Sequence, residues 1–407
     1  MKLLHYISSP CSSAVAASLC LLLNFPFDDS TACAQDSITW GPVIQLSPDS
    51  TNNYTPHIAT TGNAIHSTWR MENAWMMPYI RSVNDGVSFE QPRDIGDSAI
   101  IPYGFAYNTI LSYNGILTIV FNPPGTINFP EAIYSMFSSD EGATWSYPIA
   151  SSPTDESGII YAGAMYKDTI VVVADNKAIA YNHLGLARTT NRGVDWSWTR
   201  DSIALLTASL TLSPGTLHFT SDAGINSNEF YGEVSYRRST NLGTTWYSTM
   251  ILSDDDIYSS DYSALGAYTD DSGHTTIGLA WRDAKYGMCG FAGAGIPFRL
   301  STDYGESCSN EIPLHENEPC GLRAKVVVLK NVIVVAWASS DVGFHIKVRV
   351  SMNRGESWSN VYDLTAGGNY GQMPDVALSP TAVHVAWEEA RNGGWHIFYC
   401  RGQLPIT

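Results

Sequence analysis

The chain has 407 residues and a formal net charge of −17, with 22 basic residues against 39 acidic ones. This balance argues against nucleic acid and strongly anionic polymers as partners, because both are bound through clustered positive charge.

The first 34 residues are predicted to be a secretory signal peptide. Lys2 lies near its start, residues 14–27 are apolar, and Ala32, Cys33 and Ala34 supply small residues at the cleavage positions. The apolar stretch is short for a transmembrane helix, and no later segment is apolar enough to be one. We therefore expect a secreted or periplasmic protein, with a lipoprotein anchored through Cys33 as the alternative.

One eight-residue phrase, Ser-x-Asp-x-Gly-x-Thr-Trp with small substitutions, organises the rest of the chain. Its six copies start at Ser82, Ser138, Thr189, Ser239, Ser301 and Ser351, at spacings of 50 to 62 residues. A repeat of this period indicates a propeller, solenoid or array. A glycine always stands at the fifth position, which suggests a left-handed turn residue. Asp or Asn at the third position can bond nearby backbone amides and hold the turn.

These phrases resemble the Asp-box, or BNR repeat, of the sialidase-like propeller superfamily. In that family the phrase forms the turn between the third and fourth strands of a blade, away from the pocket. The resemblance therefore implies a purely structural role for the acidic or amide residue of each copy: Asn84, Asp140, Asn191, Asn241, Asp303 and Asn353.

The segments between the phrases predict the blades. A β-rich run precedes each phrase, at 64–69, 116–121, 169–173, 216–219, 276–281 and 332–337, and a seventh run at 382–387 follows the last phrase. Residues 39–46 resemble the segments after the phrases, so we expect residues 40–46 to pair with 396–400 and complete the last blade. The prediction is a single all-β domain over 35–407, a propeller of four-stranded blades. Seven blades are favoured, and six is the alternative.

By the same resemblance, the pocket lies on the face opposite the phrases. Its loops contribute seven candidate residues: Arg70, Glu72, Tyr262, Arg282, Asp283, Glu388 and Arg391. Aromatic faces can stack on sugar rings, and arginine can hold a carboxylate with two bonds. The alternative is structural, because Arg70 and Arg282 occupy equivalent repeat positions and can pair with neighbouring carboxylates. No catalytic residue is assigned.

Sialidases of the family bind the substrate carboxylate through three arginines, the first in a Phe-Arg-Ile-Pro-like phrase of the first blade. The corresponding segment here is Tyr54-Thr55-Pro56-His57-Ile58, which has no arginine. The sequence therefore predicts a monomeric protein that binds a glycan or an extracellular protein through the mouth of the ring, without a cofactor. The alternative is a sialidase-type glycoside hydrolase or a related polysaccharide-active enzyme.

Four cysteines remain after cleavage: Cys289, Cys308, Cys320 and Cys400. An even number in an exported chain suggests disulfides. We predict a Cys289–Cys320 bridge over the pocket face, with Cys308 and Cys400 unpaired; pairing of Cys308 with Cys320 is the alternative. No cysteine or histidine spacing indicates zinc. The acidic run 254–256 lacks the ligand order of a calcium loop, so we expect no metal.

Overall fold

The computed structural model describes residues 38–72, 76–96, 107–122, 132–154, 159–175, 183–204, 207–222, 232–287, 294–316, 320–340, 343–366 and 370–405. These residues all belong to the unit Asp36–Thr407. The predicted signal peptide, residues 1–34, lies outside them.

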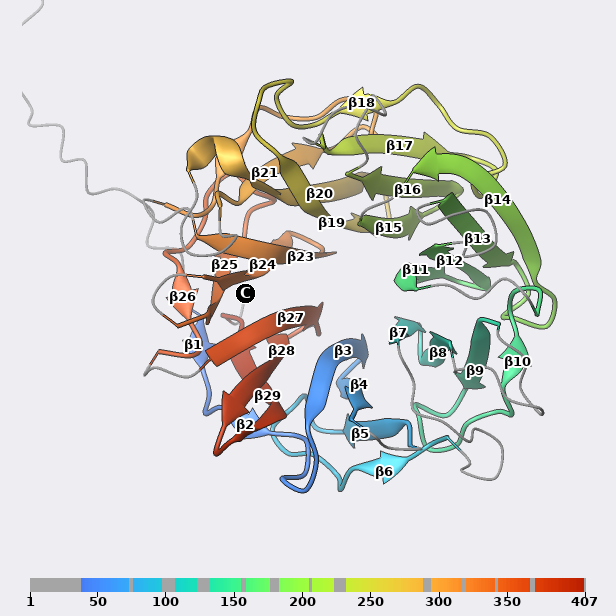
Figure 1. Cartoon of the computed structure of the whole chain (residues 1–407), viewed down its shortest axis with the longest axis vertical. Helices are drawn as coiled ribbons and strands as arrows, with labels where there is room; N and C mark the ends of the chain where they lie inside the picture. Colours follow the sequence, from blue (N-terminus) through green and yellow to red (C-terminus); the bar gives the residue numbers. More distant parts are fainter. Residues whose placement is uncertain are drawn as a thin grey trace, which may run out of the picture. The chain divides into compact units, whose positions relative to one another are not determined.

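Seven antiparallel sheets form a ring, with the first strand of each sheet innermost (Figure 1). Blade 1 contains β3 (Asn53–Thr61), β4 (Ala64–Met71), β5 (Pro78–Ser82) and β6 (Arg93–Asp94). Blade 2 contains β7 (Tyr107–Tyr113), β8 (Ile116–Asn122), β9 (Tyr134–Ser138) and β10 (Ile149–Ala150). Blade 3 contains β11 (Ile160–Tyr166), β12 (Thr169–Asp175), β13 (His183–Thr189) and β14 (Ser197–Ala204). Blade 4 contains β15 (Ala208–Ser213), β16 (Thr216–Ser221), β17 (Ser235–Ser239) and β18 (Met250–Ile251).

Blade 5 contains β19 (Ser260–Thr269), β20 (Thr275–Asp283), β21 (Pro297–Ser301) and β22 (Ile312–Pro313), with the 3-10 helix η2 (Ala284–Tyr286) after β20. Blade 6 contains β23 (Gly321–Leu329), β24 (Val332–Ser339), β25 (His345–Ser351) and β26 (Tyr362–Asp363). Blade 7 contains β27 (Tyr370–Leu378), β28 (Ala382–Arg391) and β29 (Gly394–Gln403).

The prediction of a seven-bladed propeller is confirmed, and the six-bladed alternative is wrong.

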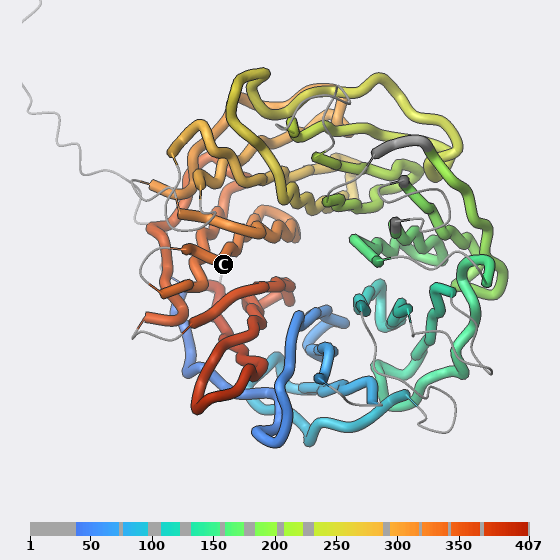
Figure 2. The backbone as a smooth tube through the Cα atoms, viewed as in Figure 1, coloured from blue at the N-terminus to red at the C-terminus, as the bar shows by residue number. Residues whose placement is uncertain are grey.

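The outer edge of blade 7 is occupied by two short strands from the start of the described chain. β1 (Thr39–Trp40) pairs with β29 at Gln403 and Gly402, and β2 (Ile44–Gln45) pairs with it at Tyr399 and Phe398. The N-terminal and C-terminal parts of the ring consequently lie side by side (Figure 2). This segment stands where the fourth strand stands in the other blades.

The hydrophobic core lies between neighbouring blades. Tyr79 of blade 1 packs with Leu117 and Phe121 of blade 2. Trp69 of blade 1 packs with Tyr399 of blade 7 in a separate cluster. Each blade is therefore stabilised by the apolar faces of its two neighbours, as expected when sheets pack face to face.

Each repeated phrase forms the predicted turn between a third and a fourth strand. In blade 2 the Ser138 hydroxyl accepts a hydrogen bond from the Gly142 N–H at 2.8 Å and donates one to Asp140 at 2.8 Å. Asp140 in turn accepts from the Thr144 N–H at 2.9 Å. The same bond, from a glycine N–H to the hydroxyl at the first position of the phrase, occurs at Gly86, Gly193, Gly243, Gly305 and Gly355.

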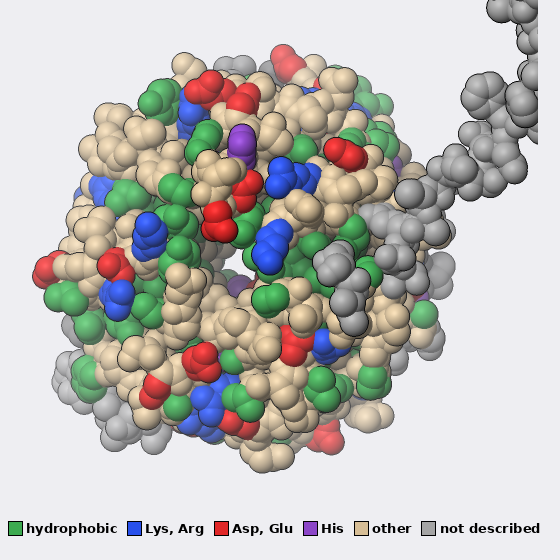
Figure 3. Space-filling model, turned by 180° about the vertical axis from the view of Figure 1, so that it is seen from behind, with side chains coloured by type: hydrophobic (Ala, Val, Ile, Leu, Met, Phe, Trp, Pro, Cys, Tyr) green, Lys and Arg blue, Asp and Glu red, His purple; other side chains and the backbone are tan. Residues whose placement is uncertain are grey.

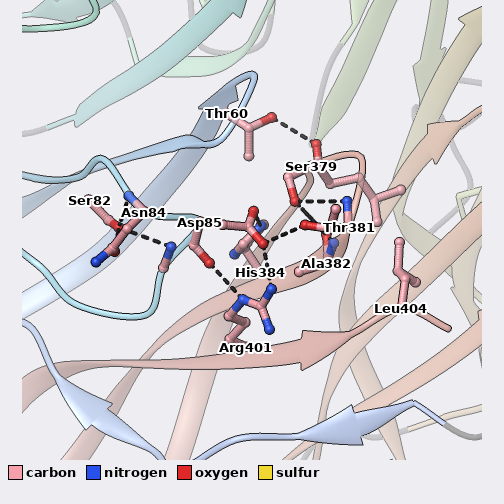
Figure 4. A network of polar contacts seen from close by, with 12 residues as sticks. Thr60, Ser82, Asn84, Asp85, Ser379, Thr381, Ala382, His384, Arg401 and Leu404 are labelled. Carbon is pink, nitrogen blue, oxygen red and sulfur yellow. Dashed lines mark hydrogen bonds and ion pairs between the residues drawn. The ribbon is translucent and has the colours of Figure 1, made fainter. Parts of the chain in front are cut away.

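The turn of blade 1 also holds the joint between blades 7 and 1 (Figure 4). Asp85 is 8% exposed and accepts hydrogen bonds from Arg401 of β29 and from the Thr381 hydroxyl, the latter at 2.6 Å. His384 lies 3.4 Å from the second Asp85 oxygen. Burial alone would raise the pKa of Asp85, but its contacts with His384, Ser379, Thr381 and Arg401 hold that pKa below its usual range.

Candidate functional site

A cavity of about 630 Å³ occupies the ring centre, where the first strands begin. All seven first strands or the residues just before them contribute polar or aromatic side chains to its wall: Thr55, His57, Tyr107, Asn108, Tyr161, Thr207, Ser209, Tyr262, Ser263, Arg323, Lys325 and Asp375. Met373 also lines it. A second cavity of about 270 Å³ lies farther along the same strands and has a mainly apolar wall that includes Leu111, Leu210 and Val328. From behind, the ring centre is open, with charged side chains of both signs around it (Figure 3). The polar cavity is the candidate site.

Three titratable side chains from neighbouring blades meet on the cavity wall. Asp375 of β27 lies 3.5 Å from the His57 Nδ1 atom of β3 and 3.9 Å from the Lys325 Nζ atom of β23. Its carboxylate also accepts a hydrogen bond from the Ile58 N–H at 3.0 Å. Burial would raise the pKa of Asp375, but Lys325 and His57 hold it below its usual range. Asp375 is therefore ionised at neutral pH.

Strained backbone is concentrated on one side of the cavity. Thr55, Tyr262, Arg323 and Met373 have φ between +46° and +52° and lie at register shifts in the first strands of blades 1, 5, 6 and 7. Such bulges turn side chains in new directions, and a bulky residue in this conformation costs about 1–3 kcal/mol. These four blades are consecutive around the ring, so the site is asymmetric.

Buried carboxylates from the preceding blade support two of these bulges. Glu388 of blade 7 accepts from the Thr55 N–H at 2.5 Å, and Asp222 of blade 4 accepts from the Tyr262 N–H at 3.2 Å. Burial raises the pKa of both carboxyl groups. Glu388 also accepts from Gln372 at 2.8 Å. Both residues shape the wall without lining the cavity.

Arg323 is the cation best placed to meet a ligand. Its guanidinium lies 5.6 Å from the centre of the Tyr262 ring, and both residues line the cavity. Among the described residues, no carboxylate oxygen lies within 4.0 Å of the Arg323 guanidinium. A half-exposed arginine with an aromatic face beneath it keeps donors available for a ligand oxygen.

The structure places the seven predicted site residues in three environments. Tyr262 lines the cavity. Glu388 lies just behind the wall, and the exposed Arg70 stacks on Tyr54 at 5.5 Å beside it. Glu72 accepts a hydrogen bond from Asn52 at 2.6 Å on the same side of the ring.

The other three predicted residues support the blades. Arg282 is 6% exposed and donates to both carboxylate oxygens of Asp261 at 2.8 Å. Asp283 is 1% exposed and accepts from the Trp281 indole N–H at 3.2 Å. Arg391 donates to the buried Glu389 and covers the Phe398 ring at 4.1 Å. Arg282 and Arg391 are each paired with a carboxylate, and Asp283 lies 3.5 Å from the Lys285 Nζ atom.

The sequence analysis did not predict Arg323, Lys325, His57 and Asp375, because its candidates came from the loops after second strands and from tyrosines near the start of first strands. A signal was present: these residues place charge at the start of otherwise apolar first strands, as in Arg323-Ala-Lys325 followed by 326–329. Bulges set which of them point toward the cavity, and the sequence does not indicate the bulges.

Cys320 is disulfide-bonded, whereas Cys308 and Cys400 are free. The alternative pairing of Cys308 with Cys320 is therefore wrong. Cys289 lies outside the described residues, so the Cys289–Cys320 bridge stays a prediction. In the described part of the chain, no group of three His, Cys, Asp or Glu residues is arranged to hold a metal ion. No helix among the same residues has the length and apolar character to span a membrane.

Comparisons with known proteins identify the fold and nothing finer. No family model and no curated protein matches the chain. The polysaccharide lyase Uly1 has a similar structure, with 10% identity over 90% of this chain and 100% of the lyase, and a TM-score of 0.55. A Dyadobacter fermentans DSM 18053 protein of unknown function covers 91% and 100% at 11% identity and a TM-score of 0.52. Phage phi92 endosialidase covers 90% and 70% at 10% identity and a TM-score of 0.51. These proteins therefore share a β-propeller fold with this chain.

Proposed function

We propose that this propeller is an exported protein that binds a glycan in the polar cavity at the ring centre, without cleaving it. The observation that carries the proposal is Arg323, which lies on the wall of the 630 Å³ cavity over the Tyr262 ring. One of its nitrogens contacts the Met373 sulfur, and no carboxylate of the described residues lies within 4 Å of it. Tyr107 and Tyr161 add further rings to the same wall. Aromatic faces beside hydrogen-bond donors suit the apolar faces and hydroxyl groups of sugars. The glycan-active propellers of similar fold agree with this class of ligand.

The set of carboxylates supports binding over hydrolysis. Most glycoside hydrolases need two carboxyl groups that flank the scissile bond, one of them protonated. Among the described residues that line the cavity, Asp375 is the one acid, and it is ionised and in contact with His57 and Lys325. Glu388 and Asp222 have raised pKa values, but both are at most 2% exposed and bonded to backbone N–H groups.

The test is a glycan array with the purified mature chain, Arg323→Ala and Arg354→Ala. Arg354 is a matched control, because it is an arginine of the same blade with a φ of +57°, yet it lies in the turn of the opposite face. We expect binding to at least one glycan, weakened about tenfold or more by Arg323→Ala through the lost charged hydrogen bonds. Arg354→Ala should bind like the wild type.

Two outcomes would overturn parts of this proposal. Absence of binding across the array, or equal binding by the Arg323→Ala variant, would refute the site. Release of sialic acid from a fluorogenic sialoside, or new reducing ends or unsaturated sugars from a bound polysaccharide, would refute the absence of catalysis.

A further inference from the structure

We infer that the bound glycan is an oligosaccharide of several sugar units, whose chain leaves the cavity across a row of four aromatic rings on blades 6, 7 and 1. This inference rests on the proposed function and adds to it the size of the ligand and the direction in which it lies. The aromatic row consists of Phe344, Tyr370, Trp395 and Tyr54.

Neighbouring rings of the aromatic row lie close together. Their centroids lie 4.6 Å apart for Phe344 and Tyr370, 6.4 Å for Tyr370 and Trp395, and 6.3 Å for Trp395 and Tyr54. Tyr370 is 42% exposed, and the other three rings are half-buried. The row therefore presents aromatic surface to solvent. Contiguous exposed surface of this kind is typical of binding sites.

Backbone hydrogen bonds hold the segments that carry the aromatic row. The backbone N–H of Trp395 donates to the Asn52 side-chain oxygen at 2.9 Å. The Asn52 side-chain amide in turn donates to Glu72 at 2.6 Å. The Gly371 N–H donates to the Phe344 carbonyl at 2.8 Å. The backbone segments that carry the rings are therefore held in place before a ligand binds.

The aromatic row is continuous with the cavity. Tyr54 directly precedes Thr55, and Tyr370 stands three residues before Met373, and both Thr55 and Met373 line the cavity. Their strands, β3 and β27, are neighbours at the ring centre (Figure 1), joined by the bond from the Ile58 N–H to Asp375. A chain that starts in the cavity therefore reaches the row without leaving the protein surface.

The polar groups beside the row favour a sugar chain over an apolar peptide. Arg70 caps the row at 5.5 Å from the Tyr54 ring, and Glu72 and Asn52 lie next to it. An apolar partner would bury these groups without hydrogen bonds, whereas sugar hydroxyls can bond to all of them. Because the chain carries a net charge of −17, the ligand is neutral or sparsely charged.

The experiment measures how affinity depends on chain length. The probes are neutral xylo-, arabino- and cello-oligosaccharides of two and six sugar units, titrated into the mature chain by calorimetry. We expect the six-unit form to bind about tenfold or more tightly than the two-unit form in at least one series. Tyr370→Ala should remove that gain and leave the affinity for the two-unit form unchanged.

Tyr247→Ala is the control, because Tyr247 is 51% exposed and stacked with Arg238, but follows the turn of blade 4. Thermal unfolding of each variant verifies its fold. If no series gains from length, or if Tyr370→Ala retains the gain, the inference is overturned. The proposed function would still stand if the array showed binding that depends on Arg323, so the two failures are distinguishable.

Discussion

At Gly142 two independent constraints exclude a side chain. Its φ is +76°, a conformation that costs other residues free energy. A Cβ atom there would also lie 1.8 Å from the hydroxyl of Tyr79 in the preceding blade. Gly355 has a φ of +87°, but a Cβ there would meet only ordinary van der Waals contacts, the nearest at 3.6 Å. The same position of the repeat thus carries one constraint in blade 6 and two in blade 2.

We expect Gly142→Ala to lower the free energy of unfolding by about 2–4 kcal/mol, because backbone strain and overpacking add. Gly355→Ala should cost about 1 kcal/mol, through strain alone. Urea unfolding monitored by tryptophan fluorescence compares the two variants with the wild type. Equal losses would show that contact with the preceding blade contributes nothing at Gly142.

Two arginines at the same position of the repeat have different environments. Arg70 and Arg282 occupy the same position of the repeat, yet Arg70 is exposed over Tyr54 and Arg282 is buried against Asp261. The difference arises from the residues opposite them on the first strands, Tyr54 in β3 and Asp261 in β19. A prediction from repeat position alone cannot separate an available cation from a paired one.

Among the elements, the second and third strands of blades 1, 4 and 7 share a buried histidine–tyrosine pair. His66 bonds with Tyr79 at 2.8 Å, and His218 bonds with Tyr236 at 2.7 Å. Burial is the main cause that lowers the pKa of His66 to about 3 and that of His218 to about 4. Both imidazoles are therefore neutral in the folded protein.

This burial predicts that stability falls as the pH falls below about 6.5. The folded pKa of His218 is lower than its unfolded value, so the unfolded state binds more protons between about pH 6.5 and 4. Above this window the group has no effect, and within it each such histidine contributes a loss of at most about 1.4 kcal/mol per pH unit.

Urea midpoints at pH 7.5, 6.0 and 5.0 measure the effect, with His218→Asn as the comparison. The variant should be less stable at pH 7.5, but its midpoint should change less with pH. Parallel pH profiles for the two proteins would contradict the assignment of His218 as a neutral buried group.

Strand positions could be predicted well where local residue type decides them. The run expected at 332–337 lies within β24 (Val332–Ser339), and the run expected at 64–69 lies within β4 (Ala64–Met71). The bulges at Thr55 and Tyr262 could not, because their left-handed backbone opposes local preference. Carboxylates of the neighbouring blades, Glu388 and Asp222, stabilise them instead.

Across the whole molecule, the repeat period and the final run without a phrase were sufficient to predict seven blades. Each phrase ends a third strand, so six phrases and one further run account for all seven sheets. The cavity wall was less predictable, because it combines residues from first strands that are distant in sequence. His57 and Asp375 meet only because the ring brings blade 7 against blade 1.

The joint between those blades depends on Asp85, and Glu141 provides its control. Both are carboxylates at the fourth position of a phrase, with φ of +58° and +54°. Asp85 contacts Arg401, Thr381 and His384 of blade 7, whereas the Glu141 side chain is exposed. We expect Asp85→Ala to lower the free energy of unfolding by about 3 kcal/mol, because it leaves buried polar partners unpaired, and Glu141→Ala by less than about 0.5 kcal/mol. Urea unfolding of both variants tests this, and similar values would refute a special role for the blade 7–blade 1 joint.

The strands β1 and β2 allow a direct test of ring closure. Deleting residues 36–46 from the mature chain would remove the partners of Gly402, Tyr399 and Phe398 and expose the β29 edge. Unpaired strand edges recruit other chains, and the deletion also removes the buried Leu46 from the core cluster that it shares with Ile58 and Tyr399. We expect a thermal midpoint lower by more than about 5 °C and concentration-dependent association in size-exclusion chromatography. A deletion variant that stays monomeric with an unchanged midpoint would show that blade 7 is held by its inner strands and by Asp85, and that the N-terminal strands do not close the ring.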